Sequence, residues 1–109
     1  MAQTATQVKN SASVVQIAVG RHIESSTAVA VTFTTGFRPL YVRVVNNTSS
    51  DKEEWFHGMA AASAHKQVAT GTSSAITTLG ITQLSYGFTF GLDTDLNVSA
   101  EQVSWLAIG

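Results

Sequence analysis

The chain of 109 residues has no cysteine, a single proline and few charged residues. The lack of cysteine excludes a disulfide scaffold, a cysteine-based zinc site and a thiol nucleophile. Its six basic and seven acidic residues leave a formal net charge of −1. Because nucleic acid and anionic membranes are attracted by a broad basic surface, we expect neither among the partners of this protein.

Long apolar runs are absent as well. No stretch of the sequence approaches the roughly 18 apolar residues that a membrane-spanning helix needs. The N-terminal residues lack the basic region and apolar segment that mark a secretory signal. We therefore expect a protein that is made and used in a cytoplasm, or exported by a route that needs no signal.

Serine and threonine take the place of the missing charged residues. Charged residues make up only 12% of the chain, about half of the usual quarter. The hydrophobic content of 44% predicts a folded protein, and the length fits one domain. A polar surface that carries so little charge suits packing against other protein.

The dominant pattern is an alternation of side chains with a period of two. Leu40, Val42 and Val44, for example, alternate with Tyr41 and Arg43. Such alternation places one set of side chains on a core and the other set outside, as in a β-strand. Turn-forming glycine, asparagine and aspartate residues separate the runs. Strands are predicted at 13–20, 27–34, 40–47, 52–57, 65–70, 73–78, 86–90, 95–99 and 102–108.

This pattern predicts an all-β fold. Regularly spaced short strands without a helical period are typical of a two-sheet antiparallel sandwich, and the strand number favours a jelly-roll-like one. We place the single β-sandwich domain at residues 13–109, preceded by an extended N-terminal arm at residues 1–12. The arm is polar and unpatterned, so it is either a frayed terminus or a segment that orders on a neighbouring subunit. Its predicted contact residues are Thr4, Thr6, Val8 and Lys9.

An acidic motif near the C-terminus is the sharpest metal candidate. Asp93, Asp95 and Asn97 have the spacing that opens a calcium-binding loop. Such a loop needs glycine and glutamate at two later positions, which Val98 and Ser104 occupy here. We therefore interpret the motif as a tight acidic turn and predict no metal site.

The remaining titratable residues form no catalytic pattern. His22, His57 and His65 lack the spacing of a zinc site. Glu53 and Glu54 are adjacent on a predicted strand, so their side chains point to opposite faces and cannot act as a carboxylate pair. Neither a nucleophile elbow nor a glycine-rich phosphate loop is present. We predict that the protein is not an enzyme and uses no cofactor.

Aromatic residues are the better indication of a binding site. Trp55 and Phe56 adjoin on a predicted strand, so one ring faces the core and the other faces outward. An exposed ring can anchor a protein partner or stack on a sugar. Trp105 alternates with core-like residues and is expected inside. Arg38, next to Pro39, is either a turn residue or a rim contact, and we name Arg38, Trp55 and Phe56 as partner-binding candidates.

Several short blocks within residues 13–109 carry strands and turns that form a recognisable set. They are VTFTTGFRP at 31–39, YVRVVN at 41–46, EWFHGM at 54–59, GIT at 80–82 and GFTFG at 87–91. This set resembles small virion proteins of tailed bacteriophages, in particular the small jelly-roll cement, or decoration, proteins that coat phage capsids.

The resemblance implies a binding function without catalysis. Such proteins bind the outer surface of the major capsid protein and stabilise the head, so we expect a capsid-surface location in the virion after synthesis in the bacterial host cytoplasm. The expected partners are the major capsid protein and further copies of the chain itself. We favour a homodimer, because two-fold symmetry is the commonest in oligomers, and a trimer is the alternative.

Two other functions stay open. One is a carbohydrate-binding or receptor-binding virion module of the tail-fibre type, which Trp55, Phe56 and Tyr86 would serve through their rings. The other is a tail-tube or head-completion component.

Overall fold

The computed structural model describes residues 16–23 and 28–109. The predicted arm and its contact residues lie outside these ranges. The described residues contain no helix. They form eight strands, which are β1 (Ile17–Ile23), β2 (Val31–Thr34), β3 (Tyr41–Asn46), β4 (Lys52–Phe56), β5 (Ser63–Gln67), β6 (Ser73–Leu84), β7 (Gly87–Phe90) and β8 (Gln102–Ile108).

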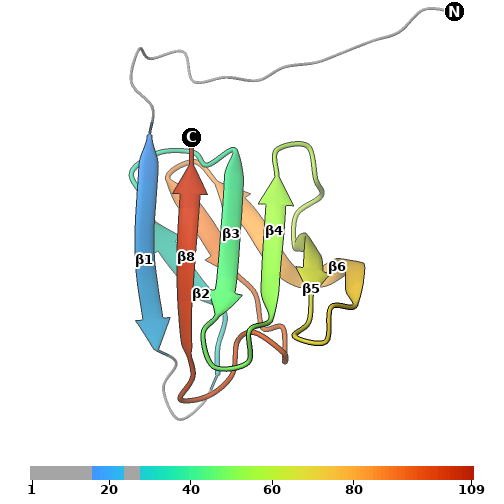
Figure 1. Ribbon diagram of the computed structural model, residues 1–109. Helices are drawn as coiled ribbons and strands as arrows, with labels where there is room; N and C mark the ends of the chain where they lie inside the picture. The colour runs from blue at the N-terminus through green and yellow to red at the C-terminus, as the bar shows by residue number, and fades with distance from the viewer. Residues whose placement is uncertain (1–15, 24–27) are drawn as a thin grey trace, which may run out of the picture.

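All eight strands belong to one antiparallel sheet with the order β1-β8-β3-β4-β5-β6-β7-β2. The sheet curls on itself, so that β1, β8, β3 and β4 form a front layer while β2 and much of β6 lie behind it (Figure 1). The predicted all-β, sandwich-like fold is confirmed. Its two layers are joined in one continuous ladder, because β5 and β6 carry the sheet from the front to the back.

The core lies between the two layers. Trp105 of β8 packs against Phe33 of β2 and Phe88 of β7, with ring centroids 5.2 Å and 5.3 Å apart. Each large side chain buried here contributes about 1.5–3 kcal/mol to stability. The buried members of the core are Phe37, Val42, Val44, Trp55, Ile81, Phe88, Phe90, Leu96, Val103 and Ala107.

Strand β6 makes the corner between the layers. Its first part pairs with β5 and its second part pairs with β7. The register shifts between Ser63 and Ala64, so that residues 77–80 bulge out of the ladder. Leu79 adopts a positive φ of 62° at this point. The sequence predicted a strand end at 78 and a turn at Gly80, and that prediction is wrong because the bulge bends the strand without ending it.

The strand predicted at 95–99 is also wrong. These residues belong to the connection between β7 and β8, where backbone groups form hydrogen bonds with other groups of the same connection. The carbonyl oxygen of Asp93 accepts hydrogen bonds from the backbone N–H groups of Leu96 and Asn97, at 3.2 Å and 2.8 Å. The side chain of Asp93 also accepts one from the N–H of Asp95, at 2.8 Å. Local bonds of this kind compete with a sheet ladder.

The close pairing of β2 and β7 leads to a first prediction. A Cβ atom added at Gly87 would collide with the backbone carbonyl oxygen of Phe33. We expect Gly87→Ala to lower the free energy of unfolding by about 3 kcal/mol or more, because backbone must move. Urea denaturation of the purified variant measures this loss.

The matched control is Gly71→Ala. Gly71 has a φ of +94° and no atom within 4 Å of the added Cβ, so only the backbone cost of about 1–2 kcal/mol remains. Equal losses in the two variants would contradict the close approach of β2 to β7.

Candidate functional site

Alternate residues of the front layer point away from the core and form one continuous surface, called the outer face below. Their neighbours along each strand, such as Val42, Val44, Trp55 and Ala107, are buried. Strand register aligns the outward residues in rows across the layer. The outer face consists of Ile17, Val19, Arg21, Ile23, Gln102, Ser104, Leu106, Ile108, Tyr41, Arg43, Val45, Lys52, Glu54 and Phe56.

The half of the outer face on β1 and β8 is apolar apart from Arg21, Ser104 and Gln102. Ile17, Val19 and Ile23 are 59%, 72% and 59% exposed. Ile108 lies opposite Ile17, and Leu106 lies opposite Val19. Contiguous exposed apolar side chains of this kind mark interaction surfaces of soluble proteins. This half of the outer face is therefore the strongest candidate contact surface among the described residues.

The other half of the outer face, on β3 and β4, combines rings with polar groups. The Tyr41 hydroxyl donates a hydrogen bond to Glu54 Oε2 at 2.6 Å. Burial, together with this bond and the negative charge of Glu54, raises the pKa of Tyr41 to about 12. The rings of Tyr41 and Phe56 are 5.1 Å apart, and those of Phe56 and His65 are 6.4 Å apart. These contacts form a row of rings across three strands.

A groove of about 330 Å³ opens where β4, β5 and the start of β6 meet. Glu54 and His65, which belong to or adjoin the row of rings, form part of its wall. Carboxylate, imidazole, ammonium and hydroxyl groups can each bind a polar ligand. The groove is lined by Lys52, Glu54, His65, Lys66, Gln67, Ser73, Ser74 and Ala75.

The structure separates the partner-binding candidates of the sequence. As predicted, Trp55 and Phe56 point to opposite faces. Trp55 is 2% exposed and donates its Nε1–H to the carbonyl oxygen of Ala60 at 3.2 Å, so its ring is not available on the surface. Phe56 is 47% exposed and belongs to the outer face. Arg38 is exposed and donates from Nη2 to Gln83 Oε1 at 3.1 Å, which ties it to β6.

The sequence pattern does not identify Ile17 and Val19 as surface residues, although both are strongly exposed on the outer face. Alternation divides the residues of this strand into two sets, but it does not say which set faces outward. The inward residues of β1 are the small or polar Ala18, Gly20 and His22. The sequence predicts that the first strand ends at Gly20, but Gly20 lies inside β1, where its missing side chain makes room for Trp105, whose ring a Cβ would approach to 2.6 Å. A glycine inside an alternating run is a usable signal of close packing.

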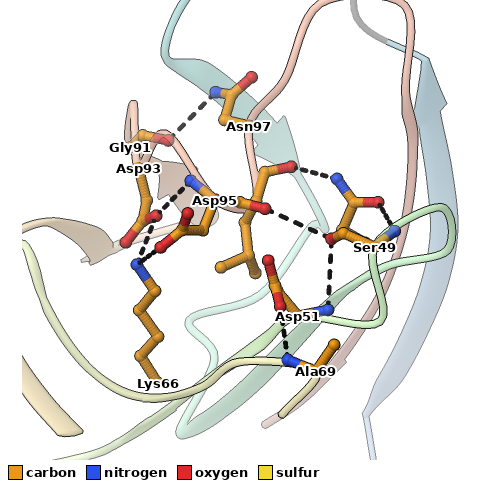
Figure 2. Close-up of polar contacts among 10 residues, drawn as sticks. Ser49, Asp51, Lys66, Ala69, Gly91, Asp93, Asp95 and Asn97 are labelled. Atoms are coloured by element: carbon orange, nitrogen blue, oxygen red, sulfur yellow. Dashed lines mark hydrogen bonds and ion pairs between the residues drawn. The ribbon is translucent and has the colours of Figure 1, made fainter. Parts of the chain in front are cut away.

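Under the outer face, polar side chains bind the connection between β7 and β8 to the front layer (Figure 2). Asn46 is fully buried and donates from Nδ2 to the carbonyl oxygen of Leu96 at 2.8 Å and to Glu101 Oε1 at 2.9 Å. Its Oδ1 accepts hydrogen bonds from the backbone N–H groups of Thr48 and Ser49. The side-chain amide of Asn46 therefore forms hydrogen bonds to two loops, the connection between β7 and β8 and the turn that follows β3.

The acidic motif of the sequence takes part in this network. Lys66 Nζ lies 2.9 Å from Asp93 Oδ1 and 2.5 Å from Asp95 Oδ2 (Figure 2). Asn97 donates from Nδ2 to the carbonyl oxygens of Val29 and Gly91. The carboxylates that suggested a calcium loop thus bind an ammonium group. Across the described part of the chain, no group of three or more histidine, cysteine, aspartate or glutamate side chains could hold a metal ion.

Glu53 is a buried carboxyl group next to this ion pair. It is fully buried on the core side of β4, where it interacts with the carboxylate of Asp93. Burial, the negative charge of Asp93 and hydrogen bonding to that carboxylate together raise the pKa of Glu53 to about 8, and the positive charge of Lys66 only partly offsets them. Glu53 is therefore mainly protonated and uncharged at neutral pH.

This shift predicts that stability depends on pH. Glu53 ionises near pH 4.5 in the unfolded chain and near pH 8 in the folded one. Because the folded state retains the proton longer, the free energy of unfolding falls as pH rises through this window. We expect Glu53→Gln to abolish the fall and to stabilise the protein by about 2–4 kcal/mol at about pH 9. Urea denaturation across the pH range measures both curves.

The control is Glu54→Gln, which removes the neighbouring carboxylate on the opposite face of β4 and should leave the fall in place. Parallel curves for the wild-type protein and Glu53→Gln would show that Glu53 does not titrate with a raised pKa.

Comparison of the chain with protein-family models, with curated proteins and with solved structures finds no match. Among the described residues, no helix is sufficiently long and apolar to cross a membrane. The function must therefore be argued from the sequence blocks and from the surface itself.

Proposed function

We propose that this chain is a non-enzymatic cement protein of a tailed bacteriophage head, which binds the outer surface of the major capsid protein and stabilises the shell. The observation that carries the proposal is the outer face. It presents exposed apolar side chains and a row of rings on a layer of four paired strands. The resemblance of the sequence blocks to small phage cement proteins supplies the class of partner.

The physical properties of the outer face suit such a role. Side chains fixed on paired strands lose little conformational entropy when they are buried in an interface. The apolar part of this face, formed by Ile17, Val19, Leu106 and Ile108, is stripped of water at low cost, since it is buried ions that carry a large desolvation penalty. On a symmetric shell that repeats the same site, weak single contacts suffice when linked copies bind together.

Phe56 provides the test of this surface. We expect Phe56→Ser to weaken binding to capsids that lack the protein by at least about tenfold, because the ring anchors the polar half of the outer face. Co-sedimentation with heads of the phage that encodes the chain measures the binding. The wild-type protein should also raise the temperature at which these heads break.

The matched control is Tyr86→Ser, since Tyr86 is 68% exposed on the hairpin between β6 and β7, in the back layer. This variant should bind as the wild-type protein does. Failure of the wild-type protein to bind heads, expanded or not, would sink the proposal. Equal weakening by both substitutions would remove the outer face as the contact surface.

The N-terminal arm is tested separately. We expect deletion of residues 1–12 to weaken head binding, because Thr4, Thr6, Val8 and Lys9 are proposed to contact a neighbouring subunit. All eight strands begin at or after Ile17, so the circular dichroism of the sheet should not change. Unchanged binding would make the segment a frayed terminus without a role in assembly.

The groove favours a second candidate function, a carbohydrate-binding or receptor-binding virion module. Its polar groups adjoin the exposed ring of Phe56, and a polar groove beside a ring is a usual arrangement for a sugar. A glycan array with the wild-type protein and Lys52→Ala separates the two candidates. A saccharide that binds the first and not the second would favour this function, and an empty array would exclude it.

A further inference from the structure

Strand β1 is an edge of the sheet. It has seven residues and stands at one end of the strand order, where β8 is its neighbour among the described strands. Figure 1 shows it along the side of the front layer, and no other described strand lies on its far side. An exposed strand of this length is a template for pairing with another strand, and proteins usually cover or block such edges. Here three of the four residues on the outer face of the edge, Ile17, Val19 and Ile23, are apolar.

The hydrogen bonding of β1 shows which backbone groups this edge presents. The N–H of Gly109 donates to the carbonyl oxygen of Gln16 at 2.8 Å. In an antiparallel ladder, bonded pairs alternate with unbonded pairs. The even-numbered residues of β1 therefore bond to β8. The N–H and C=O groups of Ile17, Val19, Arg21 and Ile23 point toward the open edge.

A second copy of β1 fits this edge in one symmetric register. An antiparallel pair with a two-fold axis at Gly20, the middle residue of the strand, overlaps all seven residues. Ile17 then lies opposite Ile23 of the second copy, and Val19 lies opposite Arg21 of the second copy. A shift of the axis to Arg21 would bring two guanidinium groups opposite each other, which is unfavourable. A shift to Val19 would set Ile17 against Arg21.

We propose that two copies of the chain associate through β1, in a continuous antiparallel sheet whose two-fold axis passes at Gly20. Self-pairing covers the open edge, buries exposed isoleucine against exposed isoleucine, and leaves the two arginines diagonal to each other rather than directly opposite. It also sets the two outer faces side by side. The inference goes beyond the proposed function, because the association needs no capsid.

The test replaces Val19, which is 72% exposed, with residues of opposite charge. In the proposed register, Val19→Arg places an arginine opposite Arg21 at two symmetric positions, whereas Val19→Glu places a glutamate there. We expect a dimer for the wild-type protein and for Val19→Glu. Val19→Arg should dimerise at least about tenfold more weakly than Val19→Glu at low salt. Sedimentation equilibrium on the full chain measures the dissociation constants.

Further variants make the result specific. Adding Arg21→Glu to Val19→Arg restores opposite charges, so the double variant should recover the dimer. Leu79→Arg changes a residue of the β6 bulge that is 50% exposed, and it should leave the dimer intact. Circular dichroism and thermal unfolding of each variant separate loss of association from loss of the fold.

Several outcomes would overturn the inference. They are a wild-type protein that stays monomeric up to about 1 mM, a trimer, and a dimer that survives Val19→Arg. Equal loss with arginine and glutamate would do so too, because it would mean that residue 19 does not face Arg21 of the second copy. A monomeric protein would leave the edge to a different occupant, such as a segment of the chain itself or another protein. None of these outcomes affects the capsid test at Phe56, so the two proposals fail separately.

Discussion

The packing of Trp105 between the layers is the contact on which the rest of the structure depends. Its indole lies directly under Gly20 of β1, and it contacts Phe33 and Phe88 from the back layer. Because one side chain touches strands at both ends of the sheet order, the sheet must curl. The ends approach through side chains, and the described strands β1 and β2 do not pair with each other. The curl thus creates a core and leaves an open edge.

The buried polar network has a different task, which is to place the connection between β7 and β8. Lys66 binds Asp93 and Asp95, and Asn46 holds the carbonyl oxygen of Leu96. Leu96 is a fully buried core residue that lies in this connection. The Lys66–Asp93 pair is largely buried, whereas Asp95 is half exposed. A buried ion pair adds little net stability, but an arrangement that separates its partners leaves a buried charge uncompensated and is disfavoured. The network therefore specifies how the connection closes the end of the core, and the uncharged Glu53 completes the packing beside it.

These two features together explain why the candidate surface lies on the front layer. The inward side of β1 is small, with Ala18 and Gly20, because the large ring of Trp105 fills the space below it. The large apolar residues of β1 consequently point outward. With the outward Leu106 and Ile108 of β8 they form an apolar surface that continues to the open edge. The outer face and the edge are thus two consequences of one packing solution, and both suit contact with protein.

The sequence by itself determined the all-β class, the alternation along most strands, and the opposite orientation of Trp55 and Phe56. These features depend on the parity of neighbouring residues, which the pleat of a strand fixes locally. Tertiary structure alone decided which of two alternating sets faces the core, as the exposure of Val19 illustrates. It also decided that β6 continues through Gly80, that residues 95–99 form turns, and that Glu53 loses its charge beside Asp93. Those outcomes depend on contacts between residues far apart in the chain, and a local pattern contains no information about them.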